Sequence, residues 1–167
     1  IARVRVEGLR DLGSAPSPLN SFQVIQGLET LEVRMQKHSQ NALELAEWLA
    51  SREEVSWVNY PGLNSSKYNE LAEKYLPKGK SGIVTFGLKK GFEAAKKVAE
   101  STEIFALLAN IGDTKSLIIH PSSTTHSQLN EEEQKSTGVS PDLVRISVGI
   151  EDIGDLKDDL DKALKAV

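Results

Sequence analysis

Apolar residues recur at spacings of three and four over a long stretch in the first third of the chain. This stretch starts at Ser17, a favourable N-cap, and Pro18, a favourable first helical residue, and it extends to about Ser51. Its apolar positions predict one long helix with a single buried seam, made of Leu28, Leu31, Met35, His38, Ala42, Leu45 and Leu49. We expect this seam to pack against a sheet or another helix.

Shorter segments follow, and segments with the residue pattern of a strand alternate along the chain with segments that have the pattern of a helix. Alternating or continuous apolar runs predict strands over residues 55–60, 82–88, 116–120 and 143–151. Helical spacing, caps and turn residues predict helices from Ser65 or Ser66 to Tyr75, and over 92–101, 131–138 and 153–165. We make no prediction for residues 1–15. This order predicts an α/β (α+β) fold, with about four strands in a sheet and helices on one face.

An arginine stands in the middle of the last predicted strand. Val144 and Ile146 face the core, so Arg145 faces the other way, together with Leu143 and Ser147. A buried arginine is usually paired, and a salt bridge to a carboxylate of the same chain is one interpretation. The other interpretation is a bidentate clamp on the carboxylate of a ligand.

A polar loop follows the third predicted strand. Pro121 ends that strand, and four consecutive hydroxyl residues and His126 come next. Such a loop is costly to bury, so we expect it at the rim of a polar site. A metal site is disfavoured because there is no cysteine and no helical histidine pair. A Ser–His hydrolase is disfavoured because Ser122 and Ser123 are too close to His126 in sequence and no nucleophile elbow is present.

Composition narrows the class of protein further. The chain has 167 residues, a net charge of -4 and no cysteine. The chain has no cluster of basic residues, so nucleic-acid binding is not predicted. No apolar run reaches the roughly 20 residues of a membrane span, and no signal peptide is evident. We expect a cytoplasmic protein without disulfides or metal. Because the chain starts at Ile1 rather than Met, we also expect it to be part of a longer protein.

Two ordered motifs resemble a known family. From Gly112 to His126 the chain has Gly-Asp-x-x-Ser-Leu-x-x-His-Pro-x-Ser-Thr-Thr-His, and from Arg145 to Leu156 it has Arg-x-Ser-Val-Gly-x-Glu-Asp-x-x-Asp-Leu. These motifs resemble the C-terminal domain of O-acetylhomoserine sulfhydrylases (O-acetylhomoserine aminocarboxypropyltransferases). Those enzymes belong to the pyridoxal-phosphate-dependent enzymes of cysteine and methionine metabolism. The stretch from Ser17 to Leu31 is also similar to that family.

The resemblance implies a fold and a domain organisation. It implies the small C-terminal domain of fold-type I pyridoxal phosphate transferases, with a mainly antiparallel sheet. Residues 1–16 would be the connection from the cofactor domain, and residues 17–167 the domain that binds the substrate carboxylate. The lysine that holds the cofactor would lie upstream of Ile1, and Lys115 does not align with it. We therefore expect neither a catalytic residue nor bound cofactor on this chain alone.

The resemblance also implies the site and the reaction. Arg145 would bind the α-carboxylate of the amino-acid substrate, Ser116 would lie beside it, and Thr125 and Asn110 would border the pocket. Taken alone, Ser116 would be an ordinary strand-edge serine and Asn110 a turn residue. The whole enzyme, a dimer or tetramer, would use pyridoxal phosphate to replace the acetate of O-acetylhomoserine by sulfide or a thiol, giving homocysteine or methionine.

Two alternatives remain open from the sequence. Within the superfamily, the chain could belong to a methionine γ-lyase or a cystathionine-type lyase or synthase, although Gly112-Asp113 and Thr124-Thr125-His126 favour the sulfhydrylase. In a different class, it could be a free-standing, non-catalytic module that binds a partner through the open face of its sheet.

Overall fold

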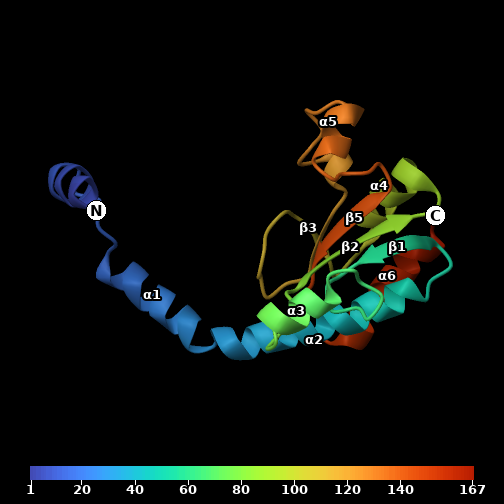
Figure 1. The fold of residues 1–167 in the computed structure, drawn as a ribbon, viewed down its shortest axis with the longest axis horizontal. Helices are drawn as coiled ribbons and strands as arrows, with labels where there is room; N and C mark the ends of the chain where they lie inside the picture. Colours follow the sequence, from blue (N-terminus) through green and yellow to red (C-terminus); the bar gives the residue numbers. More distant parts are fainter. The chain divides into compact units, whose positions relative to one another are not determined.

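The chain divides into two compact units, Ile1–Val33 and Arg34–Val167, in a computed structural model that describes all 167 residues (Figure 1). The first unit contains the π-helical segment η1 (Val4–Asp11) and the helix α1 (Pro18–Glu29). None of its residues is buried. All the strands belong to the second unit.

Five strands form one mixed sheet with the order β1-β2-β5-β4-β3. Their bounds are β1 (Val55–Asn59), β2 (Ile83–Leu88), β3 (Ala106–Leu107), β4 (Leu117–Ile119) and β5 (Leu143–Ser147). Three neighbouring pairs are antiparallel, whereas β3 and β4 are parallel. The α/β class was predicted, but the sheet has five strands rather than about four, and the parallel pair of β3 and β4 makes it mixed. The missed strand, β3, has two exposed residues, which is too short for an alternation to be visible.

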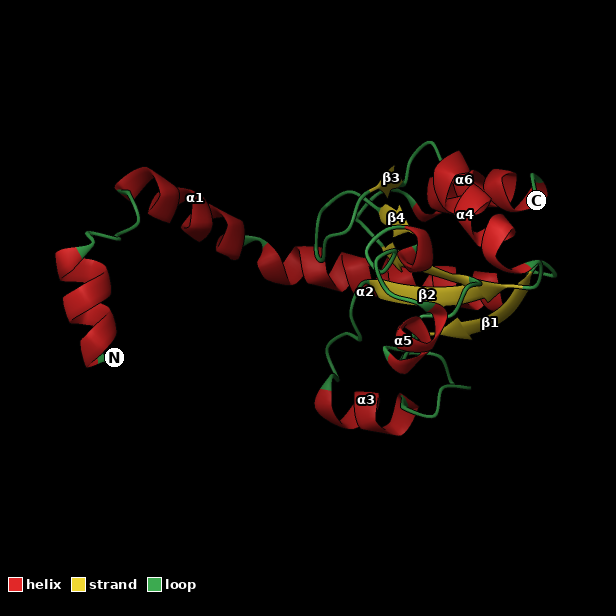
Figure 2. Cartoon of the chain, turned by 90° about the horizontal axis from the view of Figure 1, so that it is seen from above, coloured by secondary structure: helices red, strands yellow, loops and turns green.

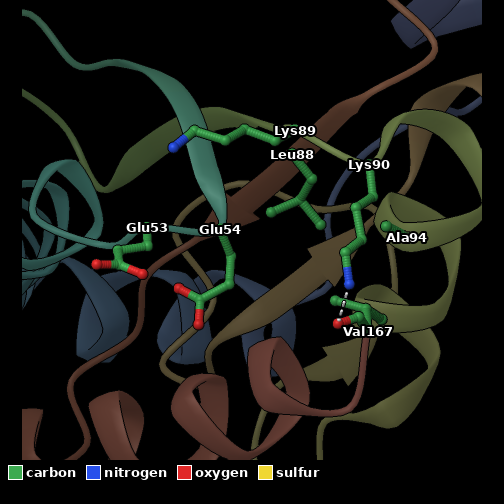
Figure 3. Close-up of a pocket in the computed structure, with 7 residues that line it drawn as sticks. All are labelled: Glu53, Glu54, Leu88, Lys89, Lys90, Ala94 and Val167. Carbon is green, nitrogen blue, oxygen red and sulfur yellow. Dashed lines mark hydrogen bonds between the residues drawn. The ribbon is translucent and has the colours of Figure 1, made fainter.

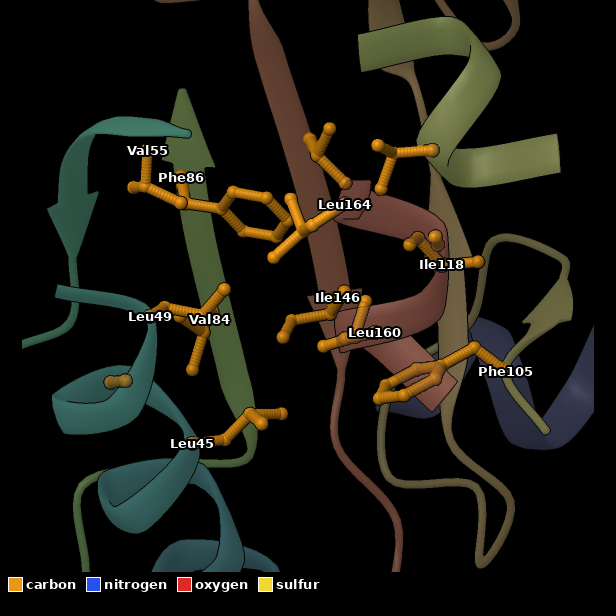
Figure 4. Close-up of a cluster of buried hydrophobic side chains, with 14 of the residues drawn as sticks. Leu45, Leu49, Val55, Val84, Phe86, Phe105, Ile118, Ile146, Leu160 and Leu164 are labelled. Atoms are coloured by element: carbon orange, nitrogen blue, oxygen red, sulfur yellow. The ribbon is translucent and has the colours of Figure 1, made fainter. Parts of the chain in front are cut away.

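Helices α2 (Leu31–Ala50), α4 (Gly91–Ser101) and α6 (Ile153–Lys165) contribute to a single core against one face of the sheet. Figure 4 shows Leu45 and Leu49 of α2 and Leu160 and Leu164 of α6 directed toward the central strands. Helices α4 and α6 lie side by side over the sheet (Figure 2). The apolar positions that alternate along β2 and β5 supply the sheet side of this core, namely Val84, Phe86, Leu88, Val144 and Ile146.

The prediction of one long helix is wrong, because the helix is interrupted at Thr30. Thr30 has φ −108° and ψ 5°, outside helical values, and it separates α1 from α2. A β-branched residue is a weak helix former, so an interruption at this position costs little. The predicted seam is buried from His38 onward, whereas the side chains of Leu28 and Leu31 are 59% and 40% exposed. Periodicity shows an apolar stripe but not whether the same chain covers it.

Local capping signals identified several helix starts correctly. The side chain of Ser17 accepts the N–H of Asn20 at the start of α1. At α5 (Glu131–Ser136), Asn130 and Glu133 form a capping box, and Asp152 caps α6. The helix expected from Ser65 or Ser66 instead starts later, as α3 (Asn69–Tyr75), and only its Ala72 is buried.

Tyr60 anchors the end of β1 to its neighbours. The ring is buried, and its hydroxyl lies 3.0 Å from the carbonyl of Ser81 and 3.3 Å from that of Ser39 in α2. Burial raises the pKa of Tyr60 to about 12, so the hydroxyl stays protonated and remains a donor well into the alkaline range. This contact joins the segment before β2 to the end of β1.

The second face of the sheet is less open than we expected. Leu117, Ile119, Leu143 and Ser147 point to this face, and each is at least nine-tenths buried. The middle of the face, at Arg145, is only half-buried. Thr85 and Ile83 of β2, on the same face, are also half-buried, so the opening on this face includes Arg145 and the adjoining part of β2.

Candidate functional site

Arg145 lies at the centre of the sheet. It is paired with Thr85 on β2 and with Ile119 on β4, so strands flank it on both sides. Its neighbours in sequence, Val144 and Ile146, are fully buried in the helix-side core. The alternation of β5 therefore fixes the side chain of Arg145 on the opposite face, as the sequence predicted.

The guanidinium of Arg145 pairs with no carboxylate of the chain. The ion pairs of the structure all involve other residues. The one hydrogen bond of the Arg145 side chain is from Nη2 to the carbonyl of Asn110, at 3.3 Å. Because a guanidinium has five N–H donors, most of them remain available to a ligand. The internal salt bridge that we considered is therefore absent, and a half-buried cation without a counter-ion is left on this face.

Asn110 is brought to Arg145 by the loop between β3 and β4. Its carbonyl accepts the hydrogen bond from the guanidinium, and its side-chain oxygen accepts the N–H of Ile111 at 2.8 Å. The loop turns at Gly112, which has a positive φ of 73°. The structure thus joins two of the four predicted site residues, through the backbone of Asn110.

Ser116 is hydrogen-bonded within the chain. It is fully buried, and both of its donors are bound by Glu151: the N–H to Oε1 at 2.7 Å and the hydroxyl to Oε2 at 2.9 Å. Its Oγ also accepts the N–H of Gly149 at 2.8 Å. Sequence reasoning did not single out Glu151, whose only signal was its place in the Arg-x-Ser-Val-Gly-x-Glu motif. Ser116 is therefore satisfied within the chain.

Thr125 is exposed, and no hydrogen bond joins it to Arg145, Asn110 or Ser116. Its Oγ1 lies 2.9 Å from Nδ1 of His126. It follows η2 (Pro121–Ser123) in the hydroxyl-rich loop.

His120 is buried and fixes this loop. Its Nδ1 lies 2.8 Å from Oγ of Ser123, its Nε2 lies 2.8 Å from the carbonyl of Pro141, and its ring packs edge-on against Phe92. Both ring nitrogens are used, so His120 acts as an anchor rather than as a ligand.

The chain offers few groups for other chemistry. No group of three or more His, Asp or Glu side chains is arranged to hold a metal ion. None of the lysines is buried, and Lys115 is exposed in the turn before β4. A lysine that holds pyridoxal phosphate needs a shielded position, so the residues of this chain do not fit that cofactor by themselves. No helix is both long and apolar enough to cross a membrane.

A cavity of about 220 Å³ lies at the end of β2 (Figure 3). Leu88, which contributes to its wall, belongs to the helix-side core, and Lys90 donates to the carbonyl of Val167 at 2.8 Å. Arg145 lies on the other face of the sheet, so the cavity and the arginine do not form one site. The cavity is lined by Glu53, Glu54, Leu88, Lys89, Lys90, Ala94 and Val167.

The fold and the site therefore define an α/β domain whose sheet presents one unpaired arginine. The chain belongs to the Cys/Met metabolism PLP-dependent enzyme family, whose sequence pattern matches residues 3–165. Pyridoxal phosphate is the cofactor of this family.

Named relatives agree with this assignment. The chain is 54% identical over 168 residues to O-acetyl-L-homoserine sulfhydrylase of Leptospira meyeri, covering 100% of the chain and 38% of the relative. It is 51% identical over 165 residues to O-acetyl-L-homoserine sulfhydrylase 1 of Thermus thermophilus, covering 98% of the chain and 39% of the relative.

A solved structure from Campylobacter jejuni, described as an O-acetylhomoserine (thiol)-lyase with a pyridoxyl-lysine phosphate group, has a TM-score of 0.89 and 46% identity. The match covers 98% of this chain and 39% of that one. The chain thus spans about two fifths of the length of the relatives it matches.

Proposed function

We propose that this chain is the C-terminal, substrate-carboxylate-binding domain of a pyridoxal-phosphate-dependent O-acetylhomoserine sulfhydrylase, in the small-domain fold of fold-type I transferases. The observation that carries this proposal is the half-buried guanidinium of Arg145, which has no carboxylate partner in the chain. The identity to named sulfhydrylases, 54% and 51%, supports the substrate class.

In this proposal Arg145 binds the α-carboxylate of O-acetylhomoserine. A planar guanidinium makes two parallel hydrogen bonds to a carboxylate, which fixes both the distance and the orientation of the amino acid. That orientation decides which bond at the α-carbon faces the reacting groups, and positioning of this kind is a large part of catalysis. Asn110 contributes by holding the guanidinium through its carbonyl.

Ser116 and Thr125 remain predicted substrate-binding residues. Direct binding by Ser116 would require its N–H and hydroxyl to leave Glu151, which now accepts both. Thr125 is exposed and available to a ligand that borders its loop.

The cofactor would be held by the remainder of the enzyme. When bound, pyridoxal phosphate supplies an electron sink for the replacement of acetate by sulfide or a thiol. We propose that residues 1–16 connect to that cofactor domain and that residues 17–167 form the present domain. The reading frame upstream of Ile1 tests this arrangement directly. The enzyme is proposed to be a cytoplasmic homo-oligomer.

The reaction is tested with the full-length protein. We expect it to convert O-acetyl-L-homoserine and sulfide to homocysteine, with no comparable cleavage of cystathionine or methionine. Preferential cleavage of cystathionine or methionine would instead assign the chain to a lyase of the same superfamily. Absence of all these activities in a protein loaded with pyridoxal phosphate would favour the non-catalytic partner-binding module.

The isolated 167-residue chain is expected to be inactive. Because none of its lysines is buried, incubation with pyridoxal phosphate followed by borohydride should fix no stoichiometric pyridoxyl group onto a single lysine. Mass spectrometry of the digested chain measures this, with the full-length protein as the positive control. Stoichiometric labelling of one lysine of the chain, accompanied by turnover of O-acetylhomoserine, would contradict the prediction.

A further inference from the structure

The carboxylate of Glu151, to which the proposed function assigns no role, lies at the centre of a polar cluster around Ser116. It accepts both donors of Ser116, while Oγ of Ser116 accepts the N–H of Gly149. The hydrogen bonds therefore form a chain in which Gly149 donates to Ser116 and Ser116 donates to Glu151. A carboxylate with two acceptor oxygens is required for this arrangement.

The turn that carries Glu151 is itself held from two sides. From α2, Nδ2 of Asn41 donates to the carbonyl of Gly149 at 3.1 Å and to that of Glu151 at 2.9 Å. From the loop before β4, the carbonyl of Thr114 accepts the N–H of Ile150 at 3.0 Å. The exit of β5 is thus joined both to α2 and to the loop that precedes β4.

Gly149 allows these segments to approach one another. A Cβ at this position would lie under 3.0 Å from the Glu151 carboxylate, the Thr114 carbonyl and the backbone nitrogen of Ser116. Two of these three neighbours are backbone atoms, which cannot move without displacing the loop. The close contact between the two segments therefore depends on a glycine here.

The loop tied down by Glu151 is the one that reaches Arg145. It runs from β3 to Ser116 and includes Asn110, whose carbonyl contacts the guanidinium. The segment just before β3 is held by another carboxylate, the buried Asp159, which accepts the N–H groups of residues 103, 104 and 105. With both ends fixed, the middle of the loop has a defined position against the arginine.

We propose that Glu151 is a positioning residue of the Arg145 site, which locks Ser116 so that the loop holds the carbonyl of Asn110 against the guanidinium. The expected consequence, a better orientation of the substrate carboxylate, rests on the proposed function. Its structural part, the link from Glu151 to Arg145, stands independently of the substrate.

Glu151→Gln changes the hydrogen bonds between residue 151 and Ser116 while the shape of the side chain stays almost the same. The amide keeps one acceptor but replaces the other carboxylate oxygen by an NH2 group, so Ser116 can no longer donate two hydrogen bonds to a charged carboxylate. Asp142→Asn is the matched control. Asp142 is also a half-buried carboxylate and accepts Nε1 of Trp57 at 2.9 Å, but it makes no hydrogen bond to the loop.

In the full-length enzyme, Glu151→Gln is expected to raise KM for O-acetylhomoserine about tenfold to 100-fold, with a much smaller change in kcat at saturation. Asp142→Asn should leave KM unchanged, even if both variants lose similar thermal stability. An unchanged KM in Glu151→Gln would show that Glu151 is structural only.

A second measurement uses the 167-residue chain itself. In Glu151→Gln, but not in Asp142→Asn, we expect the NMR signals of the Arg145 Nε–H and the Asn110 amide to shift and amide exchange to accelerate between residues 106 and 116. If these signals do not change, the inference is overturned, whatever the assay gives. If they change but the wild-type enzyme does not accept O-acetylhomoserine, the proposed function fails while the link stands.

Discussion

Arg145→Lys in the full-length enzyme is expected to raise KM for O-acetylhomoserine by about tenfold to 150-fold. Loss of a hydrogen bond to a charged group costs about 1.5–3 kcal/mol, and each 1.4 kcal/mol is tenfold. Lysine keeps the positive charge but has no planar pair of donors, and it loses the contact with the Asn110 carbonyl. Steady-state kinetics with O-acetylhomoserine at saturating sulfide measure the change.

Arg52→Lys is the matched control for this substitution. Arg52 is also half-buried, but its guanidinium pairs with Asp161 at 2.6 Å and with Glu54 at 3.5 Å, and it lies over the ring of Trp48. We expect this variant to lose some stability and to keep its KM. Equal effects of the two substitutions on KM would mean that Arg145 has no special relation to the substrate.

Phe86→Ala is expected to lower the free energy of unfolding of the chain by about 3–5 kcal/mol, as large-to-small changes of buried aromatic residues do. Phe86 is fully buried at the centre of β2, and its ring lies among the core side chains of Figure 4. Removing the ring loses its burial and leaves a cavity that the surrounding strands and helices cannot fill.

Urea denaturation of the 167-residue chain measures this loss, and Tyr75→Ala is the control. Tyr75 is also aromatic, but its side chain is 66% exposed on α3, so its removal should change stability by no more than about 0.5 kcal/mol. Similar losses in both variants would contradict the assignment of the core to the helix side of the sheet.

The spacing of apolar residues correctly predicted the parts of the fold in which a segment's own sequence shows which of its side chains are buried. The alternation in β2 and β5 identified Val84, Phe86 and Ile146 as core residues, and the caps at Ser17 and Asp152 located helix starts. These signals are local, so they could be read without knowledge of the neighbours.

Features set by contacts between distant segments were not predictable in this way. The strand β3 exists because Ala106 and Leu107 pair with β4, although both residues are exposed. The exposure of Leu28 was not predictable either, because the periodic pattern shows an apolar stripe but not its burial.

The site shows the same division. The strand pattern was sufficient to place Arg145 on the face opposite the helices. The partner of Ser116 was not foreseen, because Glu151 is 35 residues away in sequence and reaches it only after β5 lies beside β4. The family motif identified which residues belong together, but the three-dimensional structure was needed to show which hydrogen bonds they form.

The most direct test of the account is a comparison of two ligands in the wild-type enzyme and in Arg145→Ala. One ligand is an unreactive amino-acid analogue of O-acetylhomoserine, and the other is the same compound with hydrogen in place of the α-carboxylate. We predict that the wild-type protein binds the amino acid at least about tenfold more tightly than the amine, and that this preference disappears in Arg145→Ala. Retention of the full preference in the variant would show that another group holds the carboxylate.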